Sequence, residues 1–127
     1  MGQKWNPICQ SFKSDANLAS SAWFLVALSS GGADLDVCGA GALAIGALTN
    51  DVGASNTDTK YVDVQVGGVI KVMSSDGVTD GTLLMSKSDG TAITATTGKY
   101  AIGICLQDGA DGELVSVLWA PSYYELG

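Results

Sequence analysis

The chain has 127 residues, the length of a single domain that can bury a core without disulfide or metal support. Its 13 acidic residues against six lysines and no arginine give a net charge of −7, which argues against nucleic acid or an anionic membrane as a direct ligand. Because 46% of residues are hydrophobic and only 15% are charged, we expect a folded domain with part of its surface covered by a partner.

The cysteines indicate a reducing compartment. Cys9, Cys38 and Cys105 are odd in number and lack the spacing of a metal-binding pair. Each stands among small or apolar residues, so we expect all three to be buried free thiols. The opening "MGQKWNPICQ" lacks the apolar segment of a secretory signal, and the longest apolar stretches are too short to span a bilayer.

Residues 1–21 are predicted to form an extended arm. Pro7 disfavours a helix before it, and a polar run follows, although Asp15 could cap a short helix over residues 15–20. Residues 22–29 are rich in aromatic and aliphatic side chains and end at a Ser-Gly-Gly turn, a pattern typical of a strand.

Short apolar runs separated by Gly, Asp, Ser and Thr continue to residue 119, and each run predicts a strand. These further strands cover residues 34–38, 43–48, 60–66, 69–73, 82–86, 92–96, 100–106 and 113–119, with a turn at Gly67-Gly68. Five Asp-Gly pairs supply turns, at Asp76-Gly77, Asp80-Gly81, Asp89-Gly90, Asp108-Gly109 and Asp111-Gly112. The prediction is an all-β fold, a small β-barrel or sandwich of short strands: an arm over residues 1–21, a β-domain over 22–120 and a tail over 121–127.

A short phrase occurs twice, as "AIGALTND" from Ala44 and as "AIGICLQD" from Ala101. A valine-alternating strand follows each copy. The two copies could be pseudo-equivalent halves of one core, in which an isoleucine is buried and the next glycine, Gly46 or Gly103, permits close backbone approach. Chance is the alternative, because these residue types are common in the chain.

No reactive centre is predicted, so we expect a protein that is not an enzyme. The chain has no histidine, which removes the commonest general base and metal ligand. Carboxylates cluster at Asp108, Asp111 and Glu113 and at Asp76 and Asp80, but neither stretch has the spacing of a calcium-binding loop, and turn chemistry explains both. The glycines of "CGAGALAIG" lack the spacing of a dinucleotide loop. We therefore expect no catalytic residue, metal or cofactor.

Large aromatic and apolar residues stand near both ends of the chain, outside the strand pattern. Loose termini gain little from such side chains unless they are buried against something. Tyr and Trp often anchor protein interfaces. The predicted contacts with a partner or a neighbouring subunit are Trp5, Pro7, Ile8, Phe12, Leu18, Trp119, Tyr123 and Tyr124.

Four segments together resemble the small head decoration, or capsid cement, proteins of tailed bacteriophages. They are "SFKSDANLASSAWFLVAL", "AIGALTND", "VQVGGVIKVMSSDGVTDGTLLMSKSDGTA" and "YAIGICLQDGADGELVSVLWAP", and they span most of the chain. Cys105, where the family often has alanine, and the lack of arginine are departures. The resemblance implies a barrel-like fold, a homodimer or homotrimer, synthesis in the host cytoplasm, and attachment to the major capsid protein on the outer surface of the virion head.

The favoured hypothesis is a capsid decoration protein that stabilises the phage head. A carbohydrate- or cell-surface-binding β-module of a virion, using an exposed tryptophan such as Trp5 or Trp119, is the alternative. A third hypothesis is a hydrolase that uses Asp108, Asp111 and Glu113.

Overall fold

The computed structural model describes residues 6–14, 21–28, 35–49, 60–122 and 126, with only the backbone described at residues 6, 13, 14 and 60. Within these ranges the chain forms strands and no helix, which confirms the all-β prediction. The alternative short helix at residues 15–20 lies outside the described residues. The strands are β1 (Asn6–Ser14), β2 (Leu25–Leu28), β3 (Leu35–Val37), β4 (Gly46–Leu48), β5 (Lys60–Met73), β6 (Leu83–Ser86), β7 (Ala92–Thr94), β8 (Gly103–Cys105) and β9 (Leu114–Trp119).

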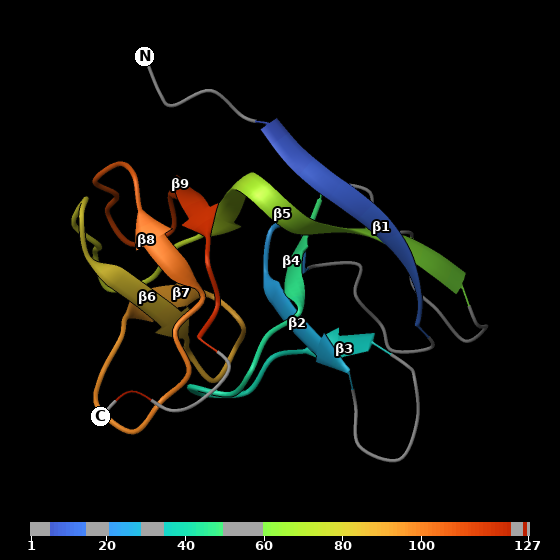
Figure 1. The fold of residues 1–127 in the computed structure, drawn as a ribbon, viewed down its shortest axis with the longest axis horizontal. Coiled ribbons are helices and arrows are strands. Elements are labelled where there is room, and N and C mark those ends of the chain that lie inside the picture. The colour runs from blue at the N-terminus through green and yellow to red at the C-terminus, as the bar shows by residue number, and fades with distance from the viewer. Residues whose placement is uncertain (1–5, 15–20, 29–34, 50–59, 123–125, 127) are drawn as a thin grey trace.

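The strands form one antiparallel sheet that curls into a half-barrel (Figure 1). Its order is β3-β2-β4-β5-β9-β8-β6-β7, and β1 pairs with β5 beside this path. In the figure, β6 to β9 lie on one side of the long strand β5, and β2 to β4 lie below its other end. Every described strand except β1 and β5 spans six residues or fewer, as the dense turn signals predict.

Strand β1 was not predicted. Part of the expected arm, residues 6–14, pairs with β5 over nine positions, from Asn6 opposite Val69 to Ser14 opposite Lys60. Ile8, Cys9, Gln10 and Ser11 are all exposed, and in this stretch only Phe12 packs toward a core. A strand with this burial needs no alternation of apolar and polar residues, so its sequence carries no strand pattern. The segment is extended, as predicted, but the ladder with β5 holds it in the sheet.

Strand β5 runs unbroken through Gly67-Gly68, where the sequence predicts a turn between two strands. The glycines bend the strand instead: Gly68 has a φ of 77°, and the register of β1 shifts between Ile8 and Cys9 opposite this point. The prediction of two separate strands is therefore wrong. β1 pairs with β5 on both sides of the bend, and the irregularity in the ladder is confined to the step between Ile8 and Cys9.

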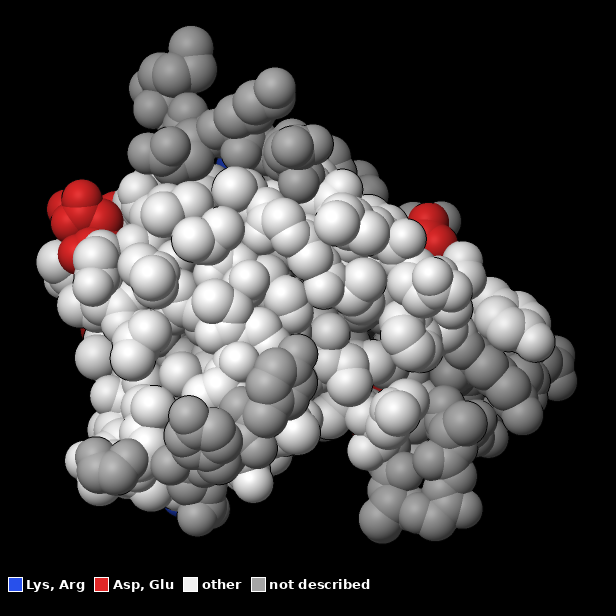
Figure 2. Space-filling model, viewed as in Figure 1, with Lys and Arg blue, Asp and Glu red and all other residues white. Residues whose placement is uncertain are grey.

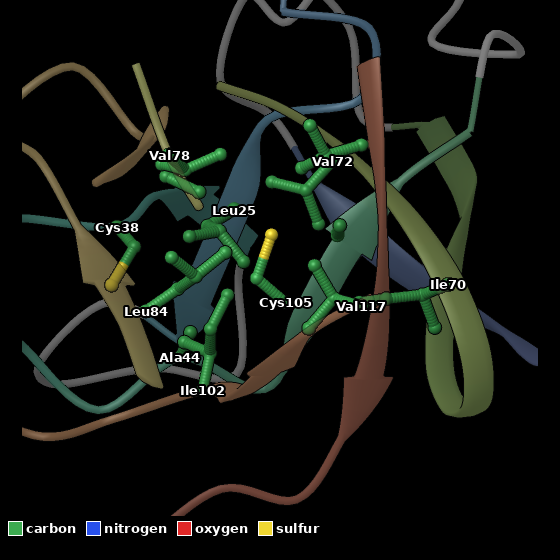
Figure 3. Packing of buried hydrophobic residues seen from close by; sticks show 13 residues of the cluster. Leu25, Cys38, Ala44, Ile70, Val72, Val78, Leu84, Ile102, Cys105 and Val117 are labelled. Atoms are coloured by element: carbon green, nitrogen blue, oxygen red, sulfur yellow. The ribbon is translucent and has the colours of Figure 1, made fainter. Parts of the chain in front are cut away.

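The bend divides the interior into two clusters of buried side chains. Val62 and Val64, before the bend, pack with Val26, Leu35 and Leu48. After the bend, Ile70 and Val72 join the larger cluster, in which side chains from β2, β6, β8 and β9 converge (Figure 3). That cluster also contains Leu25, Cys38, Ala44, Leu84, Ile102, Cys105 and Val117. A single strand thus supports both halves of the fold.

The two glycines of the repeated phrase occupy equivalent places. Gly46 in β4 lies against the following strand β5, where a Cβ would come 2.2 Å from the carbonyl oxygen of Gln65. Gly103 in β8 lies against the following strand β9, where a Cβ would come 2.1 Å from the carbonyl oxygen of Leu118. The predicted close backbone approach is therefore present at both copies. Ile102 is buried in the larger cluster, while Ile45 is half-buried against the smaller one.

Four of the five glycines in Asp-Gly pairs have positive φ, so these pairs do provide the backbone that turns require. The hairpin between β6 and β7 is an example. The N–H of Gly90 donates to the carbonyl of Lys87 at 2.9 Å, and Gly90 has a φ of 87°. Asp89 accepts hydrogen bonds from the N–H of Thr91 at 3.1 Å and from its hydroxyl at 2.6 Å. These hydrogen bonds lower the pKa of Asp89.

The cysteines do not all behave as predicted. Cys38 and Cys105 are buried free thiols, but Cys9 is exposed. Its small and apolar sequence neighbours suggest a core position, whereas the strand that carries it is solvent-exposed along this stretch. Partial desolvation, with a smaller contribution from the charge of Asp63, raises the pKa of the Cys9 thiol.

Candidate interaction surface

A row of exposed apolar side chains crosses four strands. Leu83 of β6 is directly opposite Ile104 of β8, Ile104 is opposite Leu118 of β9, and Leu118 is opposite Val69 of β5. Directly paired residues present their side chains on the same face of a sheet, so these four form one continuous apolar row. Leu83, Ile104 and Leu118 are 42%, 37% and 42% exposed, and Val69 is half-buried.

The row lies outside the core because of strand alternation. In β9, Val115 and Val117 point into the larger cluster, so Leu118 must point away from it. In β8, Cys105 is buried and Ile104 faces out for the same reason. Single exposed leucines are ordinary on protein surfaces, but a row of large apolar residues in register across four strands is typical of an interaction surface.

Ile8 brings a further exposed apolar side chain near the end of this row. It is 65% exposed and lies over Gly67, two residues from Val69 along β5. Gly67 has no side chain to cover it: a Cβ there would come 3.3 Å from the Cδ1 of Ile8. We refer to Leu83, Ile104, Leu118, Val69 and Ile8 together as the apolar row.

The face of the molecule seen in Figure 2 shows few charges, and its carboxylates lie near the rim.

Several acidic residues belong to the two loops that follow β5 and β8. In these loops Asp108 accepts a hydrogen bond from the N–H of Asp80 at 2.8 Å, and Asp111 accepts one from the N–H of Asp76 at 3.3 Å. The carboxylates therefore tie the loops together.

Glu113 also has a local structural role, because its carboxylate accepts a hydrogen bond from the N–H of Ala110 at 2.7 Å. Asp76 forms an exposed ion pair with Lys87 at 3.2 Å. Within the described part of the chain, no three His, Cys, Asp or Glu side chains gather to hold a metal ion. Nor does any helix there have the length and apolar character to cross a membrane.

A separate apolar pocket of about 260 Å³ lies between the segment that leads into β4 and the end of β9. Its lining is formed by Leu43, Ala44, Ile45, Val66, Trp119 and Pro121. Trp119 is half-buried here and packs against the larger core cluster, so its ring is not a freely exposed platform. Leu43, another lining residue, is 40% exposed.

The predicted contact residues therefore fall in different places. Ile8 is exposed near the apolar row, Pro7 is half-buried in β1, and Phe12 packs against the smaller core cluster. Trp119 lines the pocket. Trp5, Leu18, Tyr123 and Tyr124 lie outside the described residues.

Leu83, Ile104 and Leu118 are not among the contacts predicted from the sequence. One signal was available for Ile104, which stands out of phase with the buried residues of β8, where a polar side chain is the usual choice. Leu83 and Leu118 had no such signal, because the buried residues Met85 and Ser116 share their phase in β6 and β9. What the sequence does not provide is the strand order, which places the three side by side.

No protein-family model matches the chain, and no curated protein matches it either. Among solved structures, the chain is similar to the head fiber gp8.5 N base of bacteriophage phi29, with a TM-score of 0.71. The two are 20% identical, and the match covers 94% of this chain and 99% of that one. At this level of identity the likeness establishes the architecture: the chain has the fold of a phage head-fibre base.

Proposed function

We propose that the protein is a non-enzymatic decoration protein of a phage head, bound to the outer surface of the capsid through the apolar row. The observation that carries this proposal is the row itself: Leu83, Ile104 and Leu118 side by side and exposed. The likeness to a head-fibre base, over nearly the whole of both chains, supports a role on a phage head. It agrees with the resemblance of the sequence to capsid cement proteins.

The physical basis is burial of apolar area at the junctions between capsid subunits. Complete burial of an exposed leucine or isoleucine is worth about 1.5–3 kcal/mol, so half-exposed side chains contribute about 1 kcal/mol each. The binding free energy from these few side chains is small for a single copy. A capsid presents many equivalent sites, and a protein that contacts two subunits at each site stabilises the junction between them. Its acidic loops remain in solvent and keep free copies soluble.

The described carboxylates support a non-enzymatic role. Asp108, Asp111 and Glu113, the residues of the hydrolase hypothesis, each accept a backbone hydrogen bond that fixes a loop. These contacts account for the cluster without a substrate. The structure likewise favours the capsid over a sugar as the ligand of this surface, because the apolar row lacks the polar groups that orient a carbohydrate.

The experiment uses capsids of the phage that encodes the protein, stripped of it and then incubated with or without the purified chain. We expect the chain to co-sediment with the capsids and to raise the temperature at which they rupture. A reconstruction of the loaded capsids should place the apolar row against the major capsid protein. Equal rupture temperatures, with no protein in the pellet, would overturn the proposal.

A further inference from the structure

The five Asp-Gly pairs are chemically reactive as well as turn-forming. In such a pair the amide nitrogen of the glycine can attack the side-chain carboxyl carbon of the aspartate and close a five-membered succinimide ring. Glycine favours this attack, because it has no side chain in the way and its backbone rotates freely. A hydrogen bond that holds the glycine N–H against another part of the fold opposes it. The structure therefore decides which of the pairs reacts.

Four of the five glycines have their N–H held in this way. Each donates to a backbone carbonyl at a distance between 2.7 and 3.0 Å: Gly81 to Cys105, Gly90 to Lys87, Gly109 to Val78 and Gly112 to Ser74. Gly77 differs from them, because its N–H has no acceptor among the residues that the structure describes. Gly77 and Asp76 are both exposed. The attacking nitrogen is thus available in one pair and must first be released in the other four.

The restraints on Asp76 itself are weak. Its Oδ2 lies 3.2 Å from the Nζ of Lys87, but the two side chains are 63% and 38% exposed, and ion pairs this exposed hold a side chain loosely. Its N–H donates to the Oδ1 of Asp111 at 3.3 Å, which is long for a hydrogen bond. Asp76 also has a φ of 61°, unlike the aspartates of the other pairs. A residue with a Cβ is disfavoured in this region, so rotation out of it toward the reactive geometry costs less.

We propose that Asp76-Gly77 is the site at which the folded chain converts aspartate to isoaspartate. The bond from the Gly77 nitrogen to the Cγ of Asp76 forms, and the carboxyl hydroxyl leaves with the amide proton as water. A second water molecule then opens the ring. Cleavage of the bond from nitrogen to Cγ restores aspartate, whereas cleavage at the other ring carbonyl leaves the main chain running through Cγ. The mass of the chain is unchanged, and water is the sole co-reactant.

The isomerised backbone is one carbon atom longer, and this atom falls between two fixed points. On one side the N–H of Ser75 donates to the carbonyl of Ala92 at 2.9 Å. On the other side Val78 and Gly109 exchange hydrogen bonds at 2.8 and 3.0 Å, and Val78 is buried in the larger core cluster. We expect the longer backbone to disturb this second contact. Amide hydrogen exchange at Val78 should therefore be faster in the isomerised fraction than in the fresh protein.

Peptide mapping of the stored, full-length protein tests the assignment. The protein is incubated below its unfolding transition and digested, and isoaspartate is recognised as a peptide of unchanged mass and altered retention that resists a protease cleaving before aspartate. We expect it to form at Asp76 at least about fivefold faster than in any of the other four pairs, where a hydrogen bond must open first. In urea-unfolded protein the five rates should converge. Faster isomerisation at another of the four pairs would overturn the proposal.

Two matched variants give a second measurement. An asparagine forms the same succinimide with loss of ammonia, so Asp76→Asn and Asp80→Asn both report attack by the following glycine as a change of mass. Each variant keeps the hydrogen bond from its own N–H, to Asp111 or to Asp108. We expect Asp76→Asn to deamidate at least about fivefold faster than Asp80→Asn in the folded protein and at the same rate in urea. Equal rates in the folded proteins, or a faster rate in Asp80→Asn, would contradict the assignment. Neither measurement depends on capsid binding.

Discussion

The side-chain amide of Gln65 hydrogen-bonds to both backbone groups of Lys71, six residues further along the same strand. The Nε2 of Gln65 donates to the carbonyl of Lys71 at 2.9 Å, and the N–H of Lys71 donates to the Oε1 of Gln65, also at 2.9 Å. Six residues of straight strand span about 20 Å, so this contact exists only because β5 bends at Gly67-Gly68. The same Nε2 donates to the carbonyl of Leu48 at 3.1 Å. One buried amide thus links β4 to both halves of β5.

Replacing Gln65 by leucine should destabilise the fold. Leucine has nearly the same size, but it leaves the backbone groups of Lys71 and the carbonyl of Leu48 without these partners. We expect a loss of about 2–3 kcal/mol in the free energy of unfolding, measured by urea denaturation. Gln10→Leu, at an exposed position, is the control and should change stability by less than about 0.5 kcal/mol. Equal stabilities for the two variants would show that the amide does not hold the bend.

The repeated glycines should not tolerate even a methyl group. In Gly46→Ala and Gly103→Ala the new Cβ would lie 2.2 Å and 2.1 Å from a backbone carbonyl oxygen of the adjacent strand, so a strand must move. We expect each variant to lose about 1–3 kcal/mol or to fail to fold. In Gly39→Ala nothing lies within 4 Å of the new Cβ, and this variant should be near neutral. Thermal unfolding of the three variants measures the difference, and a neutral Gly103→Ala would contradict the close approach.

The thiol of Cys9 should be the one that reacts in the folded protein, and it should do so slowly at neutral pH. Its pKa is raised by partial desolvation and by Asp63, so at any pH below that pKa less of the reactive thiolate is present than in an unperturbed thiol. We measure the alkylation rate of Cys9 by mass spectrometry as a function of pH. In the folded protein this rate should rise at a higher pH than it does in the denatured chain.

Removing the charge of Asp63 should shift that profile part of the way back. In Asp63→Asn the smaller cause of the raised pKa is gone while desolvation remains, so the midpoint of the rate profile should move to lower pH. Asp36→Asn, an exposed aspartate on β3, is the control. Alkylation of Cys38 or Cys105 at the rate of Cys9 would contradict the assigned burial.

The fold class and most strand positions follow from local sequence. Asp-Gly pairs and alternating valines place the strands from residue 22 onward to within a few residues, and the repeat locates both tightly packed glycines. Two features depend on long-range contacts instead. β1 is a strand because β5 offers it a partner, and its own sequence has no strand pattern. Gly67-Gly68 resembles a turn locally, but β1 on the neighbouring edge converts it to a bend.

The apolar row is not among the contacts predicted from the sequence, for a related reason. The predicted contacts lie near the termini; of these, Trp119 is half-buried against the core, and Trp5, Leu18, Tyr123 and Tyr124 lie outside the described residues. Leu83, Ile104 and Leu118 lie far apart in sequence and become one row only through the order β6-β8-β9. Periodicity indicates which residues point outward, whereas their neighbours on the surface follow from topology.

Co-sedimentation of Ile104→Lys with stripped phage capsids tests the central claim most directly. Ile104 stands in the middle of the apolar row and is exposed, so lysine should leave the fold intact and place a charge in the contact. Thr94→Lys adds the same charge at an exposed position on β7 and is the matched control. The account predicts that Thr94→Lys binds capsids as the wild type does and that Ile104→Lys binds at least about tenfold more weakly, a difference of about 1.4 kcal/mol. Equal binding by all three proteins would contradict it.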